Sequence, residues 1–243
     1  MRSSRPRYGV DGGNVGAPIF GATLAGLAGA TWWAARRQRY LPAGLAGLAA
    51  AAVATIAAGY YYSTGPGKRA VWSEILGDLE LRGDERILDV GCGRGAVLML
   101  AAHRLPGGRA TGADVWSRRD QSGNSHRATE RNAAAEGVAD RVDLADADAR
   151  DLPFPDASFD VVVSNLVIHN ISDDVGRRQA VLEAVRVLRP GGRLRIVDPP
   201  GIHHENVLTA AGCADVTARP LDWRTSYGTP GHNMVLVSAT KPS

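Results

Sequence analysis

The stretch from Arg86 to Leu98, which reads RILDVGCGRGAVL, constrains the fold of this chain more than any other. It begins with apolar residues of strand character, continues through glycines at positions 91, 93 and 95, and ends in residues that suit a buried helix face. Glycine adopts backbone angles closed to other residues and lets a ligand lie against bare main chain, while the first amides of a following helix are free to bind it. The stretch predicts a strand, a ligand-binding loop and a helix. An ordinary glycine-rich turn is the alternative.

The charge of this loop indicates which ligand it holds. Asp89 lies two residues before the first glycine, and the spacing is Gly-x-Gly-x-Gly. A dinucleotide site uses Gly-x-Gly-x-x-Gly around a doubly charged pyrophosphate, which a carboxylate in the loop would repel. S-adenosylmethionine (SAM) carries a sulfonium and an ammonium group and no phosphate, so the same carboxylate attracts it. We therefore expect SAM as the cofactor.

Strands and helices alternate along the rest of the chain. Strands are expected near 86–90, 109–113, 141–145, 159–164 and 192–197, and helices near 95–104, 125–136 and 174–188. Alternation of this kind is typical of a parallel sheet with helices on both faces and a ligand beyond the carboxyl ends of the strands.

Two further acids fall at strand ends of this predicted sheet. Asp114 ends the second strand, where a carboxylate accepts hydrogen bonds from both ribose hydroxyls of a nucleoside. Asp148 follows the third strand and can accept from the adenine amino group, while the amide of Ala149 serves the ring. Each acid alone also fits a solvated strand end or a helix cap. Together with Asp89 they place acids at three successive strand ends, which favours a nucleoside site.

Five motifs follow one another in the order typical of the class I SAM-dependent methyltransferases, which the chain resembles from about residue 70 to 243. They are Ile87–Gly95 (ILDVGCGRG), Asp114, Asp148–Phe154 (DARDLPF), Phe159–Ser164 (FDVVVS) and Ala184–Arg193 (AVRVLRPGGR). The resemblance implies an α/β fold with a seven-stranded, doubly wound, mostly parallel sheet. Its last strand, Asn233 to Thr240, would insert antiparallel. It also implies a SAM-dependent methyltransferase activity.

The same resemblance, with the neighbours of its motif residues, defines the expected cofactor site. The residues counted in it are Asp89, Gly91, Cys92, Gly93, Gly95, Asp114, Val115, Asp148, Ala149 and Asn165. Cys92 is expected to pack inside the loop, because methyl transfer needs no covalent enzyme intermediate. Cys92 and Cys213 have no metal-like spacing, so neither a metal site nor a disulfide scaffold is expected.

The acceptor of the methyl group is less defined by the sequence. His169 comes five residues after the fourth predicted strand, where this fold opens towards the acceptor. An imidazole there could take a proton from a hydroxyl or orient an amine, so His169 is the candidate catalytic residue; a packed or capping histidine is the alternative. The run Ser164–Val167 differs from the Asn/Asp-Pro-Pro-Tyr run of enzymes that methylate amide or exocyclic nitrogens, which disfavours nucleic-acid bases. The expected reaction is direct in-line displacement at the methyl group.

Other aromatic residues and histidines receive weaker roles. Candidates for lining the acceptor entrance are Trp72, Trp116, Trp223 and Tyr227. Surface or capping positions are expected for His126, His203 and His204.

Two apolar stretches free of charge precede the predicted catalytic domain. They run from Gly16 to Ala35 and from Leu41 to Tyr62, each about the 20 residues of a membrane-spanning helix. The connection between them, Arg36-Arg37-Gln38-Arg39, is flanked by aromatic residues as at a membrane interface. We therefore expect a two-helix membrane hairpin at 16–62. A buried or interfacial helix pair and a secretory signal are the alternatives.

This hairpin sets the expected domain boundaries. A basic N-terminal tail at 1–15 precedes it, and Ser63–Gly67, rich in glycine and proline, predicts a turn and hence a linker at 63–70. The methyltransferase domain then covers 71–243. Basic residues on the two sides of the hairpin give a small bias that puts both ends, and the catalytic domain, in the cytoplasm at the cell membrane.

The charge distribution bears on partners. The chain has 28 basic and 25 acidic residues, of which eight basic and one acidic lie within 1–70, so subtraction leaves 20 basic and 24 acidic residues in 71–243. A mildly acidic catalytic domain disfavours a nucleic-acid partner, which would need a basic groove. The oligomeric state is not specified by the sequence.

The function expected is methyl transfer from SAM to an oxygen or nitrogen of a small-molecule or lipid-like acceptor near the membrane. Two alternatives are a membrane-anchored methyltransferase of protein or RNA and a non-catalytic SAM-binding membrane protein. The acidic residues and the glycine loop weigh against the second, and the acidic domain weighs against RNA.

Overall fold

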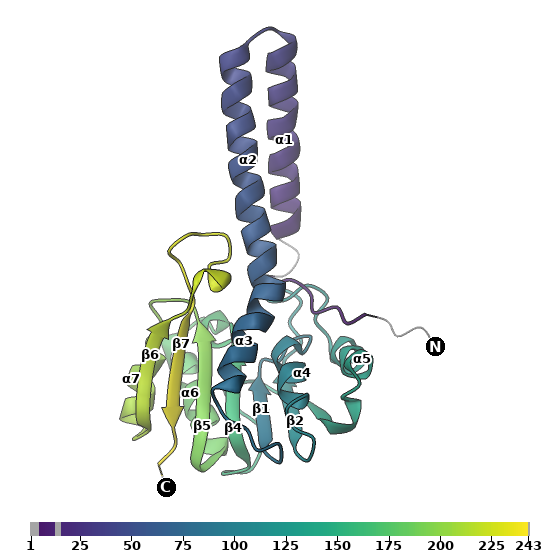
Figure 1. Cartoon of the computed structure of the whole chain (residues 1–243). Coiled ribbons are helices and arrows are strands. Elements are labelled where there is room, and N and C mark those ends of the chain that lie inside the picture. Colours follow the sequence, from purple (N-terminus) through teal and green to yellow (C-terminus); the bar gives the residue numbers. More distant parts are fainter. Residues whose placement is uncertain (1–4, 13–15, 243) are drawn as a thin grey trace.

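Residues 5–12 and 16–242 are described in the computed structural model of this chain. At their centre lies a sheet, which has seven strands, with helices on either side of it (Figure 1). The strands lie in the order β3-β2-β1-β4-β5-β7-β6. Their bounds are β1 Arg86–Val90, β2 Arg109–Asp114, β3 Val142–Asp146, β4 Phe159–Asn165, β5 Leu188–Asp198, β6 Ala214–Pro220 and β7 Val235–Thr240. The first five pair in parallel, and β7 runs antiparallel between β5 and β6. The predicted mixed sheet with an antiparallel last strand is confirmed.

Helices cover both faces of the sheet. Their bounds are α3 Lys68–Gly77, α4 Ala96–Ala102, α5 His126–Glu136, α6 Asp174–Val187 and α7 His204–Ala210. Side chains alternate between two buried clusters, as the two-residue period of a strand requires: Ile87 packs with α3 and α4, whereas its neighbour Leu88 packs with α6. Both faces are therefore closed, and the edge at the carboxyl ends of the strands is left to form a site.

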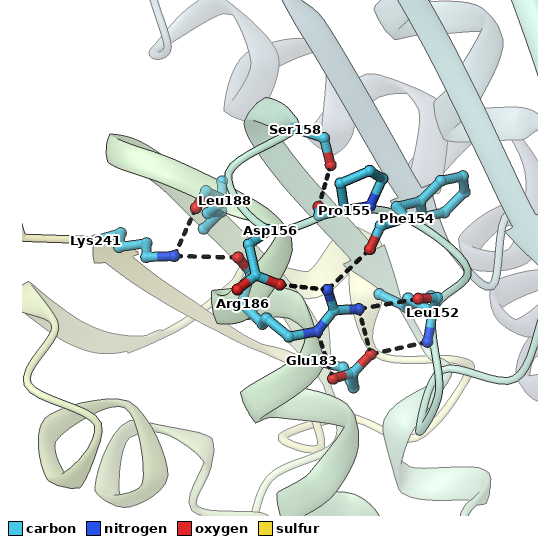
Figure 2. Close-up of polar contacts among 9 residues, drawn as sticks. All are labelled: Leu152, Phe154, Pro155, Asp156, Ser158, Glu183, Arg186, Leu188 and Lys241. Carbon is cyan, nitrogen blue, oxygen red and sulfur yellow. Dashed lines mark hydrogen bonds and ion pairs between the residues drawn. The ribbon is translucent and has the colours of Figure 1, made fainter.

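At the amino ends of β4 and β5, an arginine ties α6 to the loop before β4 (Figure 2). Arg186 donates hydrogen bonds to Glu183 and Asp156 and to the carbonyl oxygens of Leu152 and Phe154, over 2.7 to 2.9 Å. Lys241 donates to the carbonyl oxygens of Arg186 and Leu188. The second half of the DARDLPF motif thus serves the scaffold and not the cofactor edge.

Two antiparallel helices project from the domain side by side (Figure 1). They are α1, Gly16–Arg36, and α2, Tyr40–Tyr62. Within the described residues, one helical segment, Tyr40–Gly77, is long and apolar enough to cross a membrane. Most residues of its most apolar stretch are not buried. The prediction of two helices apolar enough to cross a membrane is wrong for α1, because its glycine, threonine and tryptophan residues lower its mean hydropathy.

The segment expected to be a turn and linker, 63–70, is helical. Ser63–Gly67 forms a π-helical turn that joins α2 to α3, and the amide of Lys68 donates to the carbonyl oxygen of Ser63, five residues back. Pro66 has no amide to donate, and the wider π turn accommodates it without breaking the helix. Ser63 and Gly67 are buried, and the amide of Tyr227 donates to Ser63 Oγ. The predicted turn is wrong, because glycine and proline also occur in π turns, and the domain boundary at 63–70 stays a prediction.

Residues 5–12, which we name the N-terminal strap, lie on the domain, where the sequence predicted a basic tail. Asn132 of α5 accepts from the amide of Arg7 and donates to its carbonyl oxygen. Val10 and Ser122 exchange two hydrogen bonds, of 2.8 and 3.0 Å. The strap therefore runs across the carboxyl edge of the sheet.

Candidate functional site

One cavity of about 600 Å³ lies at the carboxyl ends of the central strands. Its walls include the loop after β1, the end of β2, the segment after β4 and Pro199 after β5. This is the position at which parallel α/β sheets bind ligands. Nine of the predicted site residues line it: Gly91, Cys92, Gly93, Asp114, Val115, Asp148, Ala149, Asn165 and His169. The other two, Asp89 and Gly95, lie behind the wall: Asp89 is buried in β1, and Gly95 begins α4.

The glycine loop has the backbone that its sequence requires. Gly91, Gly93 and Gly95 all have positive φ, and a Cβ on Gly91 would lie 2.1 Å from Val167 Cγ2. Cys92 is buried within the loop, and burial raises the pKa of its thiol well above the usual value. A protonated, buried thiol is suited to packing, as predicted from the sequence.

Asp114 holds the loop from the neighbouring strand. One carboxylate oxygen accepts from the amide of Gly93 at 2.7 Å, and the other accepts from the amide of Trp116 and from Asn124 Nδ2. Burial raises the pKa of Asp114, although these hydrogen bonds oppose the rise. The carboxylate therefore shapes the loop as well as lining the cavity.

Asp89 is an unusual carboxyl group. Its side chain is buried, and Oδ2 has no hydrogen-bond partner among the described residues. Burial raises the pKa of Asp89 to about 8, and the charge of Asp114 adds to the rise. A cationic ligand beside it would stabilise the ionised form.

Asp148 reaches the cavity with a partner that the sequence did not suggest. Arg150, two residues later, donates to both carboxylate oxygens, with Nη2 2.6 Å from Oδ2. This ion pair lowers the pKa of Asp148. An adenine amino group would have to share the carboxylate with the guanidinium.

Of the four aromatic residues expected at the acceptor entrance, Tyr227 lines the cavity. Trp72 is 1% exposed in the core, where Nε1 donates to Asn165 Oδ1 at 2.7 Å. Trp223 stacks on Tyr62 away from the cavity, and Trp116 contacts His126. The expectation for these three is wrong, since burial and aromatic pairing depend on contacts distant in sequence.

His169 belongs to a chain of three polar side chains. It lies in the short helix Ile168–Asn170 after β4, and its Nδ1 is 2.9 Å from Asp198 Oδ1 at the end of β5. The other carboxylate oxygen of Asp198 is 2.8 Å from Nε2 of His204. Burial would raise the pKa of Asp198, but hydrogen bonds from both histidines outweigh it and lower the pKa. His204 is 2% exposed, so the prediction of a surface or capping role is wrong.

Among the other residues that line the cavity, four come from segments that precede β1. They are Asp11 and Gly12 of the N-terminal strap, Tyr60 near the end of α2, and Lys68 at the start of α3. Sequence reasoning missed them because no motif links such distant positions. The helical spacing between Lys68 and the buried Trp72 is the one local signal that could have pointed to Lys68.

Comparison with known proteins agrees with this architecture. Residues 88–196 match the family model of a methyltransferase domain.

Curated relatives match this methyltransferase domain. The 27-O-demethylrifamycin SV methyltransferase of Amycolatopsis mediterranei is 40% identical over 126 residues, which cover 51% of this chain and 42% of that protein. The ubiquinone/menaquinone biosynthesis C-methyltransferase UbiE of Roseobacter denitrificans is 34% identical over 133 residues, covering 54% and 50%. The chain thus spans about half the length of these relatives.

Solved structures share the fold of the methyltransferase domain. Geranyl diphosphate C-methyltransferase from Streptomyces coelicolor A3(2), in complex with Mg²⁺, geranyl diphosphate and S-adenosyl-L-homocysteine, has a TM-score of 0.55 at 19% identity and covers 71% of this chain and 79% of its own. The [4+2]-cyclase SpnF has a TM-score of 0.58 at 23% identity and covers 70% and 79%. Identities this low establish the fold alone.

The residues of the methyltransferase domain fit SAM. The unpartnered carboxylate oxygen of Asp89 and the carboxylates of Asp114 and Asp148 suit a cationic nucleoside. The match of residues 88–196 to a methyltransferase domain and the residues of this cavity together support a SAM-dependent methyltransferase.

Proposed function

We propose that this protein transfers the methyl group of SAM to an apolar or amphiphilic small molecule drawn from a membrane. The observation that carries the proposal is the continuity of one cavity, which extends from Asp114 and Asp148 past His169 to Tyr60 near the base of the projecting hairpin. SAM supplies an electrophilic methyl group. The residues of the chain bind the two reactants, orient them and hold the acceptor's proton.

The cofactor half of the cavity is assigned to the residues at the ends of β1 to β3. Asp114 would accept from the ribose hydroxyls, Asp148 and Ala149 would face the adenine, and Asp89 would face the positive end of the ligand. The main chain at Gly91 and Gly93, on either side of the buried Cys92, would allow SAM to approach closely, because these two residues have no side chain. Val115 and Asn165 complete this half, and Gly95 acts by starting α4.

His169 is the candidate base for the acceptor. In the tautomer that donates Nδ1–H to Asp198, the lone pair of Nε2 is available to accept a proton from a hydroxyl or to orient an amine. The buried carboxylate of Asp198 would stabilise the imidazolium that forms. This arrangement supports transfer to oxygen or nitrogen.

The projecting hairpin at 16–62 is proposed as a membrane anchor with both ends in the cytoplasm. Large apolar side chains are exposed along it, among them Ile19, Leu41, Leu45 and Leu48. At the tip, the guanidinium of Arg36 lies 4.3 Å from the ring centre of Trp32, a combination suited to the headgroup layer. An anchor here would confine the cavity to the layer in which a poorly soluble acceptor is concentrated.

The relatives' names are consistent with a small-molecule acceptor, since they mention rifamycin SV, quinones and geranyl diphosphate. A membrane-anchored methyltransferase of protein or RNA is the second candidate, and a SAM-binding protein without methyl transfer is the third. SpnF shares the fold and is named a [4+2]-cyclase, so the fold alone does not fix the reaction.

Three measurements test the proposal. Calorimetry of the full-length protein with SAM should give a dissociation constant in the micromolar range, and absence of binding would refute the cofactor assignment. Native membranes incubated with methyl-tritiated SAM should then yield label in the lipid extract. Label confined to protein, RNA or water-soluble metabolites would refute the membrane acceptor, and recovery of the full-length chain in the soluble fraction without detergent would refute the anchor.

A further inference from the structure

An ion pair in the cavity has no role in the proposed reaction. Lys68 Nζ lies 2.6 Å from Oδ1 of Asp11 and 2.5 Å from Oδ2, and both residues line the cavity. The lysine side chain is 6% exposed and that of Asp11 16%. A lysine is rarely buried without a negatively charged partner. Asp11, in the N-terminal strap, supplies that partner from 57 residues away.

The fold places Lys68 at one end of the cofactor region. Trp72 lies one helical turn further along the same face of α3 and donates to Asn165 at the end of β4. Lys68 is also close enough to Asp89, in β1, for its charge to lower the pKa of that carboxyl group. The lysine therefore lies by the ends of β1 and β4, on the opposite side from Asp148.

The chemistry of SAM determines what this end would bind. With adenosine at the ends of β2 and β3, as proposed above, the methionine portion would extend towards β1 and β4, and it ends in an ammonium group and a carboxylate. The charge of Asp89, behind the cavity wall, would favour the ammonium group, and the ammonium of Lys68, which lines the cavity, would pair with the carboxylate. Asp11 already offers Lys68 a carboxylate, held with both oxygens.

We propose that Asp11 occupies the position of the methionine carboxylate on Lys68, so that the N-terminal strap and SAM compete for this lysine. The proposal rests on the proposed function, because it takes SAM as the ligand of the cavity. When SAM binds, its methionine carboxylate would replace the carboxylate of Asp11 on the ammonium group of Lys68.

Displacement of Asp11 would also open the cavity towards the hairpin. Tyr227 Oη donates to Asp11 Oδ2 at 3.0 Å, and Tyr60 Oη donates to the carbonyl oxygen of Asp11. Gln121 and Asp11 form an isolated bridge, and the amide of Gly12 donates to Asp120. Since Tyr60 and Tyr227 both line the cavity, release of the strap frees the side by which an acceptor from the membrane would enter. SAM would then bind before the acceptor.

Calorimetry of the full-length protein in detergent micelles tests the competition. Asp11→Asn removes the competing charge and should bind SAM about tenfold more tightly than the wild type, the difference expected for one charge-assisted contact. Decarboxylated SAM has no carboxylate for Lys68. Its dissociation constants for the wild type and for Asp11→Asn should therefore differ less than those of SAM. Asp84→Asn, which removes an exposed acid outside the cavity, controls for the change in net charge and should leave SAM affinity unchanged.

Unchanged or weaker SAM binding by Asp11→Asn would overturn the competition. Failure of the wild type to bind SAM would instead overturn the proposed function. Lys68→Met should weaken SAM binding and abolish the preference for SAM over its decarboxylated form.

Amide hydrogen exchange of the wild type gives a test that needs no variant. If SAM displaces the strap, the amides of Val10 and Gly12, which donate to Ser122 and Asp120, should exchange faster in its presence. Slower exchange would mean that the strap closes over the cofactor and would overturn the proposal.

Discussion

Oδ1 of Asp198, at the end of β5, lies 2.9 Å from Nδ1 of His169, in the short helix after β4, although 29 residues separate them in the sequence. The carboxylate is buried and has a second histidine, His204, on its other oxygen. A buried carboxylate with two imidazole partners is fixed in orientation, so it fixes the ring of His169 in turn.

We expect Asp198→Asn to lower turnover about 100-fold, within the range of general acid–base catalysis, because an amide no longer selects the tautomer with its lone pair on Nε2. The readout is label transfer from methyl-tritiated SAM in native membranes, together with its pH profile. SAM affinity should change less than about threefold, which a general loss of structure would not allow. Turnover equal to that of the wild type would contradict the role of His169 as a base.

Asp89 should make SAM binding release a proton. Its pKa of about 8 leaves it mostly protonated at pH 7, and a cation beside it favours ionisation. Calorimetry in two buffers of different ionisation enthalpy measures this proton, which Asp89→Asn should abolish. Heats that do not depend on the buffer in the wild type would contradict the assignment.

The same carboxyl group sets a pH dependence of stability. Folded Asp89 keeps its proton up to about pH 8, whereas an unfolded aspartate loses it near pH 4, so its contribution to the free energy of unfolding falls as pH rises between these values. Thermal melts of the wild type, compared with Asp89→Asn across this range, should show the difference in slope.

Asp114→Ala should raise the SAM dissociation constant at least about tenfold, because it removes the proposed ribose acceptor and the acceptor of the Gly93 amide. Asp114→Asn, which keeps one oxygen acceptor, should have a smaller effect. Circular dichroism checks that both variants fold. A dissociation constant unchanged in the alanine variant would exclude the ribose assignment.

Arg186→Ala should destabilise the domain by about 2 to 3 kcal/mol, because it removes hydrogen bonds to four groups and leaves Glu183 without its charge partner. The melting temperature should drop while the SAM affinity of the folded protein stays the same. Arg178→Ala, at an exposed position on the same helix, is the matched control and should melt like the wild type. Loss of SAM affinity without loss of stability would contradict the scaffold role.

Local sequence signals predicted the sheet and one half of the site. The glycines at 91, 93 and 95 and the acid at 114 are readable because a strand end, a tight turn and a helix start follow one another within a few residues. Nine of the eleven predicted site residues consequently meet at one cavity, and their individual roles stay predictions.

The other half depends on contacts between distant residues, which no local pattern encodes. Asp11 meets Lys68 across the hairpin, 57 residues away, and His169 meets Asp198, 29 residues away, only because β4 and β5 are neighbours in the sheet. The prediction of a turn at Ser63–Gly67 is wrong for a different reason. Its glycine and proline residues fit into a π-helical turn, which packs against the loop that holds Tyr227.

The unbroken helix from Tyr40 to Gly77 makes the hairpin and the catalytic domain one lever. Tyr60 and Lys68 are eight residues apart on it, about 12 Å along the axis, and both face the same cavity. With the hairpin in a bilayer, the cavity would stand at a fixed height and angle to the headgroups. The length of this rigid helix would then set the distance between the cavity and the bilayer that holds the acceptor. A tilt of the hairpin would also move Lys68.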